Sequence, residues 1–311
     1  MKRRIDFGRV AAYLASLIFW LIVVLLFVRV GAGQPSGLIL PRADVIFLDA
    51  ENGLWRQRAC AGFCRREITV SGLSGQLIGI DYRPSDGLLY GLDDTGRLYT
   101  IDARGAATQV STLTLPFGGD VRSLMDFNPV VDALRLIGAN DQNYAVVNAN
   151  GNLNLTVAQT SLRYADGDVN AGRNPNVVGG AYANNVAGAA TTLFYGIDYD
   201  LDALVTIAPP LVGAGSSNTG GGQLQTIGRL VDWTGRRFDL DATADVDIYT
   251  FGGANRLIGV SGGKIFSIEI DKLQVPPTGQ TQRVFARWIP LGVHAQFIDV
   301  AVGPPRAACD Y

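Results

Sequence analysis

Residues 79–91 read GIDYRPSDGLLYG, an apolar-Asp-apolar run followed by a turn and a second apolar run. Pro84 and the Asp86-Gly87 pair favour a turn, and short apolar runs on both sides of such a turn are typical of two antiparallel strands. The same pattern returns, the last time more weakly, in residues 125–137 (MDFNPVVDALRLI), 196–205 (GIDYDLDALV) and 238–249 (FDLDATADVDIY). The sequence therefore predicts a repeated β unit.

The spacing of the repeats predicts the architecture. Their aspartates lie 45, 72 and 41 residues apart: Asp81, Asp126, Asp198 and Asp239. Intervals of about 40–45 residues are typical of one four-stranded β-propeller blade, and the longer interval indicates an insertion or a degenerate blade. We expect residues 38–311 to form an all-β, propeller-like domain of about six blades, closed or incomplete. A strand at 297–302 would pair with one near 45–48 and leave no open sheet edge.

Composition excludes several classes of protein. The 311 residues include 38 glycines and 13 prolines without a collagen-like period, so many tight turns are expected rather than a fibrous or disordered chain. The formal charge is −2 and no segment forms a basic domain, which argues against nucleic acid as a partner. With one histidine and three cysteines, the chain has few residues that could form a metal site or a His-based catalytic site. His294 is expected to be structural. We expect no enzyme activity.

The N-terminal segment is typical of a membrane anchor. Residues 1–9 (MKRRIDFGR) are basic, and residues 10–28 (VAAYLASLIFWLIVVLLFV) carry no charge. A helix of that length covers roughly 28 Å, close to the ~30 Å hydrocarbon core of a bilayer. We therefore predict a single transmembrane helix at 10–29 whose basic N-terminus stays in the cytoplasm.

This topology would put residues 30–37, a short flexible tether, and residues 38–311 on the periplasmic side of a bacterial inner membrane. The alternative is a signal peptide cleaved near Val30-Gly31-Ala32, although the apolar run exceeds the usual 7–15 residues. Small residues on the cytoplasmic half of the helix have a spacing that lets another helix approach closely: Ala11, Ala12, Ala15 and Ser16. A lone anchor would also tolerate them.

The cysteines predict a disulfide rather than a metal site. Cys60 and Cys64 form C-x3-C without a nearby histidine or second pair, whereas structural zinc needs four ligands. Outside the cytoplasm the natural product is a disulfide, either Cys60–Cys64 or one of these with Cys309. The neighbouring basic segment is expected to face lipid headgroups, an acidic partner or solvent: Arg56, Arg58, Arg65 and Arg66.

One loop has the composition of a calcium site. Asp166, Asp168 and Asn170, followed by Asn174 and Asn176, offer the oxygen atoms that Ca²⁺ prefers, although the EF-hand spacing is absent. The same residue types also form turns by bonding to nearby backbone amides, so a structural Ca²⁺ ion and a simple turn both remain open. No other cofactor is expected.

The remaining acids are expected to be structural. The repeat aspartates, with Arg83 and Arg135, could line a central channel, but catalytic groups seldom recur in every repeat. Carboxylates at alternate positions are expected to be solvated: Asp239, Asp241, Asp245 and Asp247.

The repeats resemble a bacterial family defined as domain of unknown function 4394. The resemblance covers roughly residues 73–270 and rests on 77–84 (LIGIDYRP), 88–91 (LLYG), 98–101 (LYTI), 126–129 (DFNP), 164–172 (YADGDVNAG), 174–176 (NPN) and 191–198 (TTLFYGID). It implies a propeller-like extracytoplasmic domain without an established activity. The predicted helix and the Cys60/Cys64 segment lie outside it.

Together these features favour a non-catalytic accessory or scaffold subunit of a larger membrane protein complex, held on the bilayer by its anchor. Respiratory and photosynthetic complexes are examples of such assemblies. One alternative is a Ca²⁺-dependent extracytoplasmic hydrolase of lactones or glycans, and another is a cell-surface carbohydrate-binding module. The fold alone does not distinguish among these functions.

Overall fold

The computed structural model describes residues 43–58, 64–149, 152–207, 221–290 and 295–304. They belong to one compact unit, Pro41–Tyr311. The regular elements in these residues are β-strands, which confirms the all-β prediction. No helix in this part of the chain is long and apolar enough to span a bilayer. The predicted helix at 10–29 and its small residues Ala11 to Ser16 lie outside the described residues.

The strands form three four-stranded antiparallel sheets and one nine-stranded sheet. Apart from the short β12 (Arg163–Tyr164), the larger sheet divides into two antiparallel sets of four, so that five sets of four are called here sheets 1 to 5. Sheet 1 contains β21 (Phe297–Val302), β1 (Val45–Asp49), β2 (Gly53–Gln57) and β3 (Cys64–Thr69). Sheet 2 contains β4 (Leu77–Tyr82), β5 (Leu89–Asp93), β6 (Arg97–Ile101) and β7 (Ala107–Thr112). Sheet 3 contains β8 (Leu124–Asn128), β9 (Ala133–Ile137), β10 (Asn143–Ala149) and β11 (Asn152–Ala158).

Sheets 4 and 5 are joined at their outer edges. Sheet 4 contains β13 (Val177–Tyr182), β14 (Phe194–Asp198), β15 (Ala203–Ile207) and β16 (Gln223–Val231). Sheet 5 contains β17 (Asp245–Phe251), β18 (Ala254–Ser261), β19 (Lys264–Ile268) and β20 (Gln282–Ile289). Strand β16 pairs in parallel with β20, and the short β12 (Arg163–Tyr164) pairs in parallel with β16.

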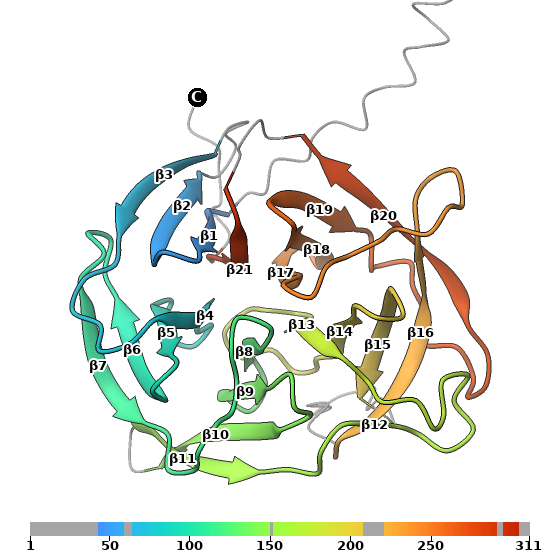
Figure 1. The fold of residues 1–311 in the computed structure, drawn as a ribbon, viewed down its shortest axis with the longest axis horizontal. Helices are drawn as coiled ribbons and strands as arrows, with labels where there is room; N and C mark the ends of the chain where they lie inside the picture. Colours follow the sequence, from blue (N-terminus) through green and yellow to red (C-terminus); the bar gives the residue numbers. More distant parts are fainter. Residues whose placement is uncertain (1–42, 59–63, 150–151, 208–220, 291–294, 305–311) are drawn as a thin grey trace, which may run out of the picture. The chain divides into compact units, whose positions relative to one another are not determined.

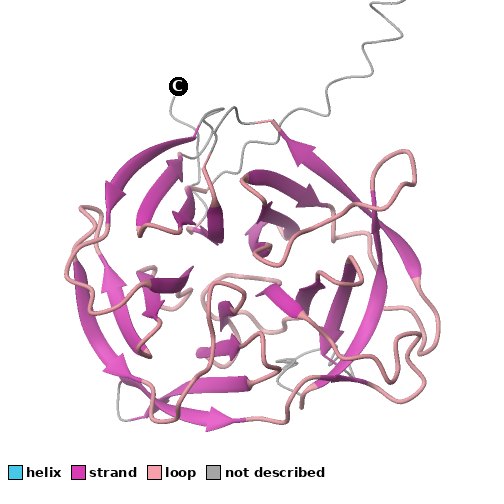
Figure 2. Cartoon of the chain, viewed as in Figure 1, coloured by secondary structure: helices cyan, strands magenta, loops and turns pink. Residues whose placement is uncertain are grey.

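The five sheets lie around a common centre, and one edge strand of each sheet is innermost (Figure 1). The innermost strands are β21, β4, β8, β13 and β17. Each contacts the next, and β17 contacts β21, so these strands form a closed cycle. Strands and loops surround this centre in the described part of the chain (Figure 2).

Pairing between the two ends of the described chain completes sheet 1. Strand β21 pairs with β1 in antiparallel register, with Val45 opposite Val302 and Phe47 opposite Val300. This is the pairing predicted from residues 45–48 and 297–302. It ties the first described strand of the chain to the last one.

Hydrophobic clusters fill the spaces between neighbouring sheets. One cluster joins sheets 2 and 3, where the Tyr90 and Phe127 rings meet with centroids 5.1 Å apart. Four further clusters lie between the remaining pairs of neighbours around the cycle. Each sheet is therefore covered on both faces, which explains why β4, β8 and β9 are buried along almost their whole length.

The structure forms five four-stranded sheets rather than the six units predicted from the repeat spacing. The prediction assumed 40–45 residues per unit. Long connections use more chain than that, among them residues 159–176 around β12, 232–244 before β17 and 269–281 before β20. These insertions account for the missing sixth unit.

Candidate functional site: a buried acidic centre

Five aspartates lie on four of the innermost strands. Asp81 is on β4, Asp126 on β8, Asp245 and Asp247 on β17, and Asp299 on β21. All five are 5% exposed or less. Asp81, Asp126 and Asp247 each present an oxygen atom within 4.8 Å of the others. These five residues are called the acidic centre below.

The carboxylates of the acidic centre connect neighbouring sheets. The Phe127 amide donates to Asp81 Oδ2 (2.7 Å), and the Tyr182 amide donates to Asp126 Oδ1 (2.9 Å). An innermost strand has a sheet partner on one side only, so some of its buried N–H groups need another acceptor. The aspartates supply that acceptor from the preceding strand of the cycle.

The same contact joins sheet 5 to sheet 1. The Val300 amide donates to Asp245 Oδ2 (3.1 Å), and the Val302 amide donates to Asp247 Oδ2. Two carboxylates of β17 therefore hold β21, the strand that also pairs with β1. The acidic centre thus reinforces the point where the two ends of the chain meet.

Strand β13 is the exception, because it carries glycine where the other innermost strands carry acid. A Cβ atom added to Gly179 would lie 2.6 Å from Asp245 Cα and 2.9 Å from the Ala244 carbonyl oxygen. Both distances are shorter than real Cβ contacts, so only glycine permits this approach of β13 to β17. Direct backbone contact replaces the carboxylate at this interface.

Burial changes the protonation chemistry of the acidic centre. Loss of water raises the pKa of Asp81 and of Asp126 well above the usual range, and the negative charges of neighbouring members raise it further. Burial likewise raises the pKa of Asp245 and Asp299, and it raises the pKa of Asp247 to about 7. Hydrogen bonds from backbone amides oppose the rise at Asp81 and Asp247.

The acidic centre also has unused acceptors. Asp81 Oδ1 and both carboxylate oxygens of Asp299 are buried and have no hydrogen-bond partner among the described residues. A buried oxygen without a partner is costly, so such atoms usually have a role or hold an unseen ligand. The centre can therefore take up protons or a small cation.

A second polar site lies where several innermost strands end. A cavity of about 160 Å³ is bordered by residues 82–84, 185–187, 248–250 and 302–304. Its charged side chain is Arg83, and no carboxylate of the described residues borders it. The cavity is small, and Asp81 and Asp247 directly precede residues that border it.

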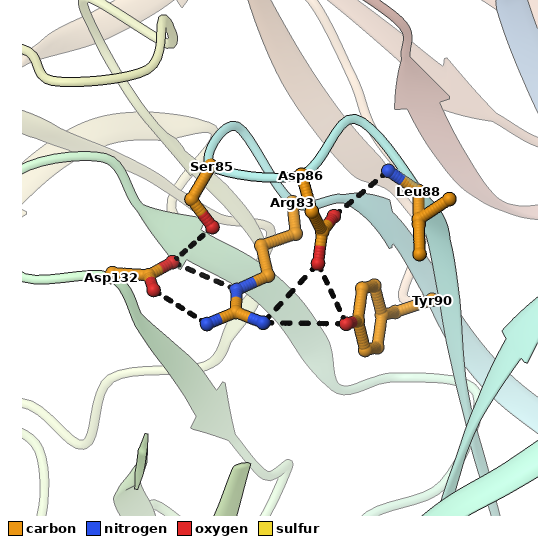
Figure 3. A network of polar contacts seen from close by, with 6 residues as sticks. All are labelled: Arg83, Ser85, Asp86, Leu88, Tyr90 and Asp132. Atoms are coloured by element: carbon orange, nitrogen blue, oxygen red, sulfur yellow. Dashed lines mark hydrogen bonds and ion pairs between the residues drawn. The ribbon is translucent and has the colours of Figure 1, made fainter. Parts of the chain in front are cut away.

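Arg83 links sheets 2 and 3 (Figure 3). Its guanidinium group donates to both oxygens of Asp132 (2.8 and 2.5 Å), and it also reaches Asp86 (3.2 Å). Tyr90 donates to Asp86 (2.9 Å), and burial raises the pKa of Tyr90. The bond to Asp132 raises the pKa of Arg83, which stays charged. Arg83 is thus engaged within the protein.

Comparison with known proteins assigns the family. The family model described as Domain of unknown function (DUF4394) matches residues 57–284. The chain belongs to this family. The resemblance inferred from the repeats is thereby confirmed, and the match extends beyond both ends of the predicted range.

Other comparisons add little to this assignment. A search of curated proteins finds no match. Among solved structures, the chain is similar to an auxiliary nutrient binding protein from Bacteroides thetaiotaomicron, with 12% identity and a TM-score of 0.39. The alignment covers 68% of this chain and 55% of the other, so it spans about half of that protein.

The loop with the predicted calcium ligands has the contacts of a turn. Asp168 accepts hydrogen bonds from the Thr226 amide (2.7 Å) and hydroxyl (2.7 Å), and Asn170 donates to the same hydroxyl (2.9 Å). The Asp166 side chain is fully exposed and lies 3.7 Å from Arg163. Asp168 and Asn170 meet at Thr226, whereas Asp166 points into solvent.

The structure divides the repeat aspartates into two groups. Asp81 and Asp126 occupy innermost strands, but Asp198 ends β14, the second strand of sheet 4, and accepts a bond from the Tyr164 hydroxyl (2.6 Å). Asp239 is exposed and pairs with Arg237 (3.5 Å). Strands β14 (FYGID) and β4 (LIGIDY) have nearly the same sequence, yet β4 is an innermost strand and β14 is not. The sequence similarity of the third repeat to the first therefore did not indicate an equivalent position in the fold.

Two acids expected to be solvated are buried. Asp245 and Asp247 were grouped with Asp239 and Asp241 because they alternate along a short segment, yet they belong to β17 and to the acidic centre. The sequence motifs described above do not single out Asp299. The signal that could have found it is the apolar-Asp-apolar pattern of residues 297–302, which matches that of β4 and β8.

Other predicted residues have structural contacts or lie outside the described part. Arg135 is buried and donates to the Tyr182 hydroxyl (2.6 Å) and to Asn143 Oδ1 (2.5 Å), so it does not line a channel. Arg56 lies 3.3 Å from Asp44. Cys60, Cys309 and His294 lie outside the described residues, as does the side chain of Cys64.

Proposed function

We propose that this protein is a membrane-anchored, periplasmic β-propeller of five blades that acts as a non-catalytic accessory subunit of a larger membrane protein complex. The five sheets around a common centre support the propeller description. The uncharged segment at residues 10–28 supports the anchor. The observation that carries the functional proposal is an exposed aromatic and cationic surface on β16, β20 and the turn after β16, called the outer patch below.

Two aromatic side chains of the outer patch have few internal contacts. Trp233 is 87% exposed and Phe285 is 59% exposed. Trp233 follows Val231, the register partner of Phe285, by two residues, so both aromatic residues belong to the same end of the β16–β20 pair. Exposed Trp and Phe side chains are enriched at protein interfaces, where they supply large contact areas.

The turn that carries Trp233 is already ordered. Asp232 accepts bonds from the Thr234 amide (2.8 Å) and the Thr234 hydroxyl (2.6 Å), and the Gly235 amide donates back to the Asp232 carbonyl (2.9 Å). A partner would therefore bind Trp233 without first ordering its loop, which lowers the entropic cost of association.

Arginines give the outer patch a positive charge. Arg229 and Arg283 are exposed register partners on β16 and β20. Neither forms an ion pair within the described part of the chain. From residue 30 onward the chain has 21 basic and 27 acidic side chains, so the patch opposes the charge of the domain as a whole. It would select a partner surface that is both apolar and acidic.

The two polar sites within the protein favour binding over catalysis. The acidic centre is at most 5% exposed, so a substrate would not reach its carboxylates. In the cavity beside it, Arg83 is held by Asp132 and Asp86. General acid–base catalysis needs a group within hydrogen-bond reach of the substrate, which neither site offers in this arrangement.

Purification of the full chain from native membranes tests the proposal. We expect a C-terminally tagged protein, extracted in mild detergent, to carry integral-membrane proteins in fixed stoichiometry. The double variant Trp233→Ala/Phe285→Ala should lose them. A matched control is Leu155→Ala, because Leu155 is an exposed apolar residue on β11, in sheet 3. A wild-type protein recovered alone would overturn the subunit proposal.

A carbohydrate-binding role is the second candidate, because an exposed indole ring such as that of Trp233 can also stack on a sugar. In that case the full chain would be retained on a glycan array, and Trp233→Ala alone would abolish retention. No membrane protein would then depend on the outer patch for co-purification.

A further inference from the structure

We infer that the acidic centre is a binding site for one divalent cation, Ca²⁺, held by Asp81, Asp126 and Asp247. The inference concerns a site away from the outer patch and does not rest on the proposed subunit role. It also differs from the loop at residues 166–170, where the sequence suggested calcium.

The geometry of three carboxylates supports a cation of this size. One oxygen of each residue lies within 4.8 Å of the other two. The ligands of one Ca²⁺ ion lie at most about 5 Å apart, twice the Ca–O distance of ~2.3–2.6 Å, so one ion can reach all three carboxylates. Mg²⁺ demands ~2.0–2.1 Å and near-ideal octahedral geometry, which three residues on separate rigid strands suit less well.

Unpartnered oxygens are the second observation. Asp81 is 1% exposed, and its Oδ2 atom accepts the Phe127 amide while its Oδ1 atom has no partner. Asp299 is also 1% exposed, and neither of its oxygens has a partner among the described residues. Asp299 lies on β21, the strand whose Val302 amide is bound by the proposed ligand Asp247.

Charge balance also points to a cation. None of the five carboxylates of the acidic centre forms an ion pair with an arginine or lysine of the described residues, and all five are 5% exposed or less. A buried carboxylate persists when it is paired or coordinates a metal. Three carboxylates around Ca²⁺ would satisfy that rule, and they would tie sheets 2, 3 and 5 to one ion.

The enclosed position predicts how the ion enters. Because the carboxylates are nearly inaccessible, Ca²⁺ would bind as the five sheets close and would leave only when they open. Washing the native protein with EDTA should therefore remove little of it. Unfolding in denaturant with EDTA should remove all of it.

The first measurement is metal content. The full chain, purified in detergent with CaCl₂ and then washed with EDTA, should retain about one Ca²⁺ per chain by elemental analysis. Asp81→Asn should retain none, although its amide oxygen can still accept the Phe127 amide. Asp166→Asn is the matched control and should retain the ion. Loss in Asp166→Asn with retention in Asp81→Asn would overturn the inference and move the site to the loop.

The second measurement does not depend on any variant folding. Wild-type protein unfolded in denaturant with EDTA is refolded with CaCl₂ alone, MgCl₂ alone or EDTA. At about 100 times the dissociation constant, Ca²⁺ should raise the Tm by about 5–10 °C over the EDTA sample, and MgCl₂ should raise it less. A metal-free wild-type protein whose Tm is the same in all three conditions would overturn the inference.

Discussion

The acidic centre and the outer patch both depart from the usual distribution of residues. The first buries charged side chains, and the second exposes aromatic ones. Charged side chains are rarely buried unless paired, yet five aspartates lie at the centre of this molecule. Large aromatic side chains are usually covered, yet Trp233 and Phe285 lie outside on β16, β20 and the adjoining turn. The buried aspartates have hydrogen-bond partners inside the protein, whereas the two exposed aromatic side chains have few internal contacts.

The two regions differ in whether contacts within the protein explain where their residues lie. Asp81 and Asp126 accept buried backbone amides of the next sheet, so the protein itself accounts for part of their placement. Nothing comparable accounts for Trp233, whose turn is held by Asp232 and not by the indole ring. A carboxylate buried inside can thus serve folding, whereas the exposed indole ring of Trp233 contributes little to it.

The largest expected effect is at the contact between β13 and β17, where β13 carries glycine in place of an acid. Gly179→Ala should destabilise the protein by about 3 kcal/mol or more, because the new Cβ would meet backbone atoms of β17 that have no room to move. Urea unfolding of the full chain in detergent measures this change. Gly221→Ala is the control, since its Cβ would meet only Thr160 at 3.6 Å. Equal losses in both variants would contradict the role of Gly179.

A smaller loss is expected when one carboxylate is removed. Asp126→Ala leaves the buried Tyr182 amide without its acceptor, which costs about 1–3 kcal/mol. Asp126→Asn keeps an acceptor oxygen and should cost less. Unfolding curves of the two variants, recorded side by side, measure the difference. An alanine variant as stable as the wild type would mean that repulsion among the acids outweighs their bonds to the backbone.

A buried carboxyl outside the centre predicts a pH effect. Burial raises the pKa of Asp198 above its usual range, with Tyr164 as its hydrogen-bond donor. The folded state therefore binds this proton more tightly than the unfolded state. Its stabilising contribution is full below about pH 3.8 and is lost as the pH rises through the folded-state pKa.

The variant Asp198→Asn isolates that effect. The stability of the wild type relative to this variant should fall as the pH rises above about 4, by about 1.4 kcal/mol for each unit by which the pKa is raised. Denaturation at several pH values provides the measurement. A difference between the two proteins that does not change with pH would argue that Asp198 ionises normally.

The smallest effect on stability belongs to the outer patch. Trp233→Ala/Phe285→Ala should change the free energy of unfolding by no more than about 0.5 kcal/mol, because surface substitutions usually have little effect. The same variant is expected to lose its membrane partners. Thermal unfolding and co-purification on one preparation test both statements. A large loss of stability would show that the aromatic residues belong to the fold after all.

Features that depend on neighbours in the chain could be predicted from the sequence. Alternation of apolar runs with turns such as Asp86-Gly87, whose glycine has φ of +70°, identified an all-β protein. The apolar segments at residues 45–48 and 297–302 correctly suggested the pairing of β1 with β21. The repeated motifs also pointed to the right family, because strand and turn preferences are carried by residues within a few positions of one another.

The number of sheets and the composition of the acidic centre depended on the tertiary structure. Asp198 and Asp81 have similar local sequences, yet one ends a second strand and the other lies on an innermost strand. Asp245 and Asp247 resemble solvated residues until β13 and β21 cover them. A carboxylate is buried or exposed according to strands that are distant in sequence, and no local pattern records which strands those will be.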